Sequence, residues 1–209
     1  ILAVRSCGRP ARTGTRGYLR KLTLQEPRDQ IDGIIGLANR RAVKAVPQIE
    51  KLLVSTDEER VRKAAAYAIF VLDRTRFDTI LKSGPENVRL ACFRVLLERE
   101  GEQRAIPWLC GALQDGPDGV RRFAFSVLER QPGDAVCEAM AGLVEDSTAD
   151  TSLRVDAAAF LGRHGDVRML VRLGRMVENV PLSDRSAVVE AVREAVRQIE
   201  KRVSQNPAG

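Results

Sequence analysis

The sequence predicts an all-α chain built from stacked helical hairpins. Apolar residues make up 44% of its 209 residues, but aromatic residues only 4%. The core must therefore consist largely of Ala, Val, Leu and Ile, which suits closely packed helices. Five segments also share one amphipathic template, with apolar residues at its start and three, four, seven and eight positions later, apart from one polar residue in each of the last two segments, Asp156 and Asp184. Hairpins that cannot bury their faces alone are expected to stack into an α-solenoid.

The five template segments share a helical phase as well as a pattern. They begin at Val61, Val88, Val120, Leu153 and Asp184. An arginine follows each start, and these repeat arginines are Arg62, Arg89, Arg121, Arg154 and Arg185. We expect each to bond a turn carbonyl or an acid of its own or the preceding repeat. A row of guanidinium groups that grips phosphates or a partner's acidic strip is the alternative.

The remaining elements follow in chain order. An apolar stripe at 31–37, after Pro27, predicts a lone N-terminal capping helix. Further stripes at 45–53, 106–113, 136–144 and 169–177 supply the first helices of about five hairpins. The first helix of the second hairpin, between Thr75 and Ser83, is expected to be short and irregular. The last helix continues to Val203.

Charge divides the chain into three parts: a basic arm or targeting remnant at 1–25, a helical body at 26–203 and a C-terminal tail at 204–209. The chain has 34 Lys and Arg residues and 28 Asp and Glu residues. The arm has no acid, and its cations are Arg5, Arg9, Arg12, Arg16, Arg20 and Lys21. The body is therefore formally neutral, which argues against a large phosphate-binding face. We expect the arm to be extended and to contact partner proteins or RNA, with Tyr18 and nearby leucines as anchors.

The repeats resemble a known family. The sequence Ala45-Val46-Pro47, then Leu52-Leu53, Asp57 and Val61-Arg62-Lys63-Ala64-Ala65, resembles the short HEAT repeat of phycobilin-lyase-like proteins. The sequence Ala105-Ile106-Pro107, then Leu113, Asp115 and Val120-Arg121, repeats the motif, and the resemblance covers roughly 42–200. The later first helices lack the proline. The resemblance implies a right-handed α-solenoid of HEAT-like hairpins, with the second helices along its concave side.

Seven residues lie off the apolar stripe of the second helices and are expected to contact a partner on that concave side. They are Lys63, Tyr67, Arg94, Arg122, Ser126, Arg130 and Arg163.

The sequence predicts no catalytic residue, metal site or cofactor. His164 is the only histidine, and no nucleophile accompanies it as a catalytic triad requires, so we interpret it as a helix-end residue. The cysteines have no metal-ligand spacing and are interpreted as small core residues in a reducing compartment. No apolar run approaches the length of a membrane span, and no small-molecule substrate is inferred.

These observations favour a non-catalytic scaffold or accessory subunit that binds other protein subunits of a larger assembly. The basic arm resembles what remains of an organelle-targeting sequence, so a mitochondrial or plastid location is expected, and otherwise a cytoplasmic one. Two alternatives stay open. One is a nucleic-acid-binding HEAT-like protein that uses the arm and the concave face. The other is a chromophore-lyase-like subunit, which only the resemblance implies.

Overall fold

The chain is all-helical, as predicted. The computed structural model describes residues 14–178, 180 and 186–205, and within these ranges it contains twelve α-helices, one short 3-10 helix and no strand. The chain divides into two compact units, Ile1–Glu98 and Arg99–Gly209, which are described separately. The handedness of the superhelix stays a prediction.

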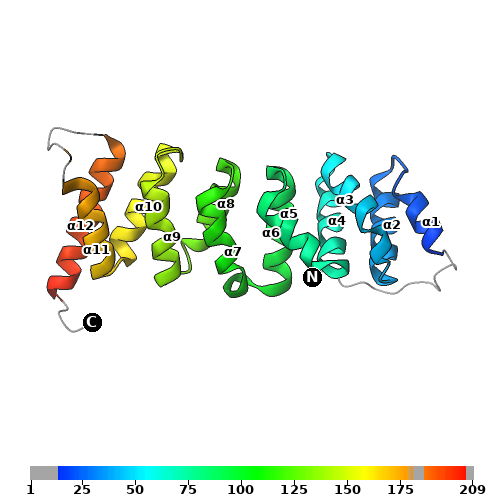
Figure 1. The fold of residues 1–209 in the computed structure, drawn as a ribbon, viewed down its shortest axis with the longest axis horizontal. Helices are drawn as coiled ribbons and strands as arrows, with labels where there is room; N and C mark the ends of the chain where they lie inside the picture. Colours follow the sequence, from blue (N-terminus) through cyan, green and yellow to red (C-terminus); the bar gives the residue numbers. More distant parts are fainter. Residues whose placement is uncertain (1–13, 179, 181–185, 206–209) are drawn as a thin grey trace. The chain divides into compact units, whose positions relative to one another are not determined.

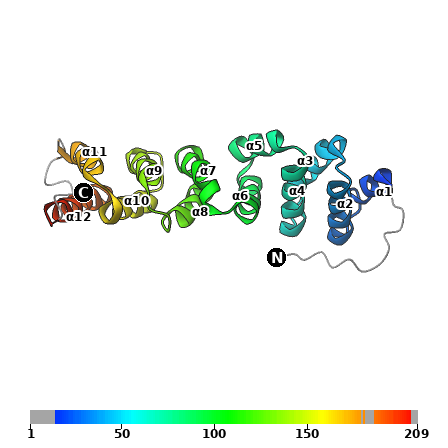
Figure 2. The same cartoon turned by 90° about the horizontal axis from the view of Figure 1, so that it is seen from below.

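The first unit contains six α-helices in its described part. They are α1 (Thr15–Lys21), α2 (Pro27–Asn39), α3 (Val46–Ser55), α4 (Glu59–Leu72), α5 (Arg74–Ser83) and α6 (Glu86–Glu100), with a 3-10 turn at Val43–Ala45 before α3. Helices α3 and α5 form one layer and α2, α4 and α6 the other (Figure 2). Helix α2 packs between α1 and α4, and α3 and α5 both pack on α4 (Figure 1). Buried apolar residues of the predicted stripes, such as Ile49, Val61 and Ile69, fill the space between the layers.

Helix α1 corrects two predictions about the N-terminal region. The arm was expected to be extended to residue 25, but Thr15–Lys21 is helical and packs on α2. Leu22 is buried at the end of this helix. Helix α2 is therefore the second helix of an additional hairpin, not a lone cap. Lys21, assigned to the arm as a partner contact, forms ion pairs with Asp32 and Asp29.

Two glycines allow α1 and α2 to approach closely. A Cβ atom at Gly36 would overlap the ring of Tyr18, and one at Gly33 would lie 2.9 Å from Lys21 Cβ and from the Tyr18 carbonyl oxygen. Arg40 covers the Tyr18 ring, with its Cζ 5.4 Å from the ring centroid. Glycine is thus required by space here, at positions where α4 carries alanine.

The third helix pair of this unit, α5 with α6, is regular, which corrects a further prediction. Helix α5 was expected to be short and irregular, yet it spans ten residues, as many as α3. Asp73 caps its start by accepting a hydrogen bond of 2.9 Å from the Arg76 backbone N–H. The buried residues of α5 are Phe77, Ile80 and Leu81.

The second unit contains three further hairpins in its described part. They are α7 (Glu102–Asp115) with α8 (Asp118–Leu128), α9 (Asp134–Glu145) with α10 (Thr151–His164), and α11 (Val167–Glu178) with α12 (Ala187–Gln205). Helices α7, α9 and α11 form one layer and α8, α10 and α12 the other (Figure 2). Gly101, at φ 82°, provides the left-handed backbone that precedes α7. Helix α10 packs closely on both α9 and α12.

The last hairpin is shifted from its predicted register. The template was placed at Asp184, but α12 begins at Ala187, and its buried residues are Val192, Ala195 and Ile199. The stripe that faces the core therefore starts at Val192. Asp184 and Arg185 lie outside the described residues.

Candidate interaction surface

The repeat arginines hold each hairpin together at its turn. Arg62 donates from its Nη2 to the Thr56 carbonyl, and Arg89 and Arg154 donate from Nε to the Leu81 and Val144 carbonyls at 2.9 Å. These acceptors lie at the C-terminal ends of the first helices, where carbonyls lack intrahelical partners. We call this side-chain bond the hairpin clasp. It spans six residues in the α3–α4 hairpin, and seven to ten in the α5–α6, α7–α8 and α9–α10 hairpins.

Arg121 shows that the clasp also joins neighbouring hairpins. Its Nη2 lies 3.3 Å from the Gln114 carbonyl and 2.9 Å from Asp146 Oδ2. The side chain is only 10% exposed. Asp146 belongs to the turn of the following hairpin, whereas the sequence pointed to an acid of the same or the preceding one. The arginine register is therefore used for internal bonds in the described repeats.

Two clasp residues escaped the sequence template. In the first hairpin, Gln30 Nε2 donates to the Leu24 carbonyl at 2.7 Å, six residues upstream, as Arg62 does to Thr56. In the last hairpin, Arg193 lies 3.4 Å from the Val180 carbonyl. Arg193 follows the buried Val192 just as Arg62 follows Val61. The Val192-Arg193 pair could therefore have been found from the sequence pattern, whereas Gln30 does not match a pattern based on arginine.

In the first unit, the residues predicted to bind a partner lie between α4 and α6. Lys63 pairs with Glu98, and Arg94 pairs with Glu59. Both pairs join residues 35 apart, so they form successive rungs between the two helices. Tyr67 is half-buried on the same helix as Lys63. Exposed ion pairs are weak, so partner contact by these residues stays a prediction.

The other predicted contact residues belong to the second unit and are dispersed there. Arg122 lies 3.0 Å from Asp150 at the start of α10, while Ser126 donates to the Phe123 carbonyl of its own helix at 2.8 Å. Arg130 is 3.9 Å from Glu102. Arg163 is exposed near the end of α10. The structure thus gives most of these side chains internal partners.

His164 is the last residue of α10, as expected of a helix-end residue. Its ring lies on Phe160, with 4.7 Å between the centroids. Partial burial lowers its pKa, and the cations of Arg163 and Arg202 lower it further. Arg202 donates to the Arg163 and Gly165 carbonyls. The cation that stabilises this helix end is therefore Arg202 rather than a protonated histidine.

The described cysteines are free thiols, and Cys92 and Cys137 are buried whereas Cys110 is half-buried. Cys92 is buried, and burial raises its pKa to about 12. Burial also raises the pKa values of Cys110 and Cys137. A thiol with a raised pKa is a poor nucleophile at neutral pH. Cys7 lies outside the described residues.

Arm residues Arg16 and Arg20 are exposed on α1, and Arg5, Arg9 and Arg12 lie outside the described residues.

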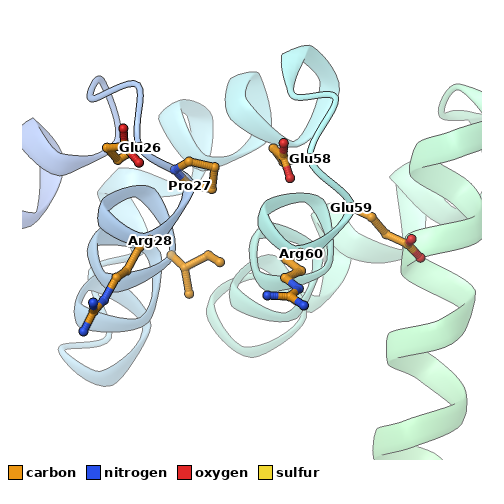
Figure 3. Close-up of a pocket in the computed structure, with 7 residues that line it drawn as sticks. Glu26, Pro27, Arg28, Glu58, Glu59 and Arg60 are labelled. Carbon is orange, nitrogen blue, oxygen red and sulfur yellow. The ribbon is translucent and has the colours of Figure 1, made fainter.

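A groove opens between the starts of α2 and α4, and the sequence did not predict it. It encloses about 660 Å³ and is lined by Glu26, Pro27, Arg28, Ile31, Glu58, Glu59 and Arg60. Its residues repeat, because Glu26 and Arg28 stand 32 positions before Glu58 and Arg60. Arg28 and Arg60 extend side by side from neighbouring helices, while Glu26 and Glu58 lie toward the helix starts (Figure 3).

The charges of this groove are available to a partner. Arg28 and Arg60 are exposed, and neither forms an ion pair with a described residue. Glu59 is engaged by Arg94 at one edge. The groove therefore offers a row of two carboxylates and a row of two guanidinium groups, beside the half-buried Ile31.

The described residues contain no cluster of three or more His, Cys, Asp or Glu side chains that would suit a metal ion. In the same part of the chain, every helix is too short or too polar to cross a bilayer.

No family model matches the chain, and no curated protein matches it.

Proposed function

We propose that the chain is a non-catalytic interaction scaffold, an accessory subunit that binds a partner protein within a larger assembly. The observation that supports this proposal is the groove between α2 and α4. Its repeated Glu and Arg residues present one negative row and one positive row of charges at the spacing of two packed helices. Clasps of Gln30 and Arg62 fix the turns that lead into these helices. The groove is thus held in shape before a partner arrives, which lowers the entropic cost of binding.

The presence of both a negative and a positive row favours a polypeptide as the occupant of the groove. A polyphosphate would meet Arg28 and Arg60 but would be repelled by Glu26 and Glu58. An extended peptide with both acidic and basic side chains can pair with both rows and can place an apolar side chain on Ile31. We therefore propose a mixed-charge segment of another subunit as the ligand.

Site-specific photo-crosslinking tests this proposal. A photoreactive residue is placed at position 28 or 60 of the full chain, with position 51 as the control, because Lys51 is exposed on α3 outside the groove. In extracts of the native source, the same polypeptide should crosslink from positions 28 and 60 but not from 51. The double substitution R28E/R60E should then remove that polypeptide from the purified complex. If positions 28 and 60 crosslink no protein above the control position, the proposed function is wrong.

We further propose that this assembly is in a mitochondrion or plastid. The acid-free, arginine-rich composition of residues 1–25 supports this location. Fractionation of the native source tests it, since the protein should co-purify with an organellar marker rather than with the cytosol.

A further inference from the structure

The C-terminal end of α2, which lies away from the groove, carries basic side chains and no acidic ones. Arg40, Arg41 and Lys44 lie there, and Arg16 and Arg20 lie on the neighbouring helix α1; we call these five cations the basic end. All five are exposed, and none forms an ion pair with a described residue. We propose that the basic end binds the phosphate backbone of a double-helical nucleic acid. This inference is independent of the proposed protein scaffold, since it concerns other residues and another class of ligand.

The α1–α2 packing brings the two groups of cations onto one hairpin. The Tyr18 ring lies against Gly36, and Arg40 covers that ring, so the start of α1 is beside the end of α2. Arg16 and Arg20 are four residues apart and share the face of α1 opposite Tyr18. That face is open, because α2 separates α1 from α4 (Figure 1).

No acid interrupts the basic end. Residues 14–25 and 33–49 contain no Asp or Glu. The acids that flank residues 33–49 are already paired: Asp32 with Lys21, and Glu50 with Arg76 at 2.7 Å. The first unit thus keeps an uncompensated positive surface although the body as a whole is formally neutral. The sequence argument against a phosphate-binding face rested on that sum and missed this distribution.

Arg41 is a second observation that points to a ligand. It follows α2 in the left-handed region, at φ 52°, where helices commonly end with glycine. Its backbone N–H bonds the Ala38 carbonyl at 3.0 Å, and the Ala42 N–H bonds the Leu37 carbonyl at 3.1 Å. A glycine would make the same two bonds without strain. An arginine here adds only its exposed side chain, so a role for that side chain outside the fold accounts for its presence.

The surroundings favour a double helix over the other anionic macromolecules. Four of the five cations are arginines, whose forked guanidinium groups match phosphate oxygens. Single-stranded nucleic acids are held by bases stacked on exposed aromatic rings, but Tyr18 is covered by Arg40. Protein interfaces centre on buried aromatic or apolar anchors, and the only large apolar side chain exposed within residues 40–44 is Val43. A duplex needs only backbone contacts of the kind this surface supplies.

The test is a salt titration of binding by fluorescence anisotropy. The full chain is mixed with a labelled RNA duplex of about 20 base pairs between about 50 and 200 mM salt, and a DNA duplex of the same sequence is a second arm. The test variant is R40Q/R41Q/K44Q. The control variant removes three exposed cations of the second unit, and it is R104Q/R175Q/K201Q.

Loss of three phosphate contacts should make the negative slope of log K against log salt less steep by roughly 3. The affinity at 0.1 M salt should fall by at least about tenfold. The control, with the same net charge, should bind within about twofold of the unaltered chain. The proposal is overturned if neither duplex binds, or if test and control variants bind alike. It is also overturned if poly-glutamate binds the basic end more tightly than either duplex, because the surface would then fit an acidic protein.

A single substitution separates binding from folding. Arg41→Gly relieves the left-handed strain, so its melting temperature should equal or exceed that of the unaltered chain, while duplex affinity should fall several-fold. A merely structural role for Arg41 gives the opposite result, with lower stability and unchanged affinity.

Discussion

The α1–α2 and α3–α4 hairpins share one design and use different residues to build it. Buried positions Gly33, Ile34 and Gly36 of α2 correspond, at a spacing of 32 residues, to Ala65, Ala66 and Ala68 of α4. Gly36 admits the Tyr18 ring, whereas α4 has the methyl group of a buried alanine at the corresponding position. The size of the side chain on the second helix therefore determines which first helix can pack there.

The clasp residue is neutral in the first of these hairpins and charged in the second, but the bond spans the same number of residues in both. Gln30 and Arg62 both bond the carbonyl six residues upstream. A neutral amide thus replaces a guanidinium group without loss of the hairpin. The two hairpins therefore share a bond at the turn and a close packing of their helices, although different residue types provide them.

The largest difference between the two hairpins is expected when Gly36 is substituted. Gly36→Leu puts a side chain where the Tyr18 ring lies, and overpacking of this kind costs roughly 1–3 kcal/mol. Helix α1 should leave α2, and hydrogen exchange of the α1 amides should become as fast as in an unfolded segment.

The matched control is Ala68→Gly in α4. It should cost about 1 kcal/mol through helix propensity and leave α3 docked. Full protection of α1 in the Gly36→Leu protein would contradict the packing described here.

The clasp offers a smaller effect. Arg62→Ala removes the bond to the Thr56 carbonyl and should lower the free energy of unfolding by about 1 kcal/mol. Arg62→Gln should recover a large part of that loss, since Gln30 makes the same bond. Urea denaturation of the three proteins measures both differences. Equal losses for alanine and glutamine would show that the packing of the arginine stem, and not the bond, stabilises the turn.

The smallest effect is expected when the pH is lowered, and it should affect the α9–α10 hairpin but not the Gln30 clasp of the α1–α2 hairpin. A side-chain hydrogen bond from Thr148, with a contribution from Arg121, lowers the pKa of Asp146, and one from Ser152, with a contribution from Arg122, lowers that of Asp150. A carboxylate with a lowered pKa stabilises the fold above its unfolded pKa, and this contribution disappears as pH falls through the folded value.

The α9–α10 turn should therefore lose protection as pH falls below the ordinary aspartate value of 3.8. The Gln30 clasp has no titrating group, so that bond should show no step of its own. Hydrogen exchange across this pH range checks the difference, with D146N/D150N as the variant that should lack the step at α9–α10. A step that persists in this variant would assign the pH dependence to other groups.

The candidate site shows where sequence reasoning stopped. The groove depends on Arg28 and Arg60, which are 32 residues apart and become neighbours only when α2 packs on α4. The basic end was partly visible, because Arg40, Arg41 and Lys44 stand in an acid-free stretch. It was missed because charge was summed over the whole body. Which cations stay unpaired depends on contacts between helices, and a sum cannot show them.

The sequence by itself determined the helical class, the hairpin repeat and the phase of the second helices α4, α6, α8 and α10, because apolar periodicity and the recurring arginines are local properties of the chain. Only the tertiary structure decided that residues 15–21 fold as the first helix of another hairpin. It also decided that Gln30 and Arg193 act as clasps and that Lys63 and Arg94 pair with acids of a neighbouring helix. These features depend on how much space a helix leaves for its neighbour and on which charges that neighbour brings close. Both are set by packing between segments that the linear pattern does not connect.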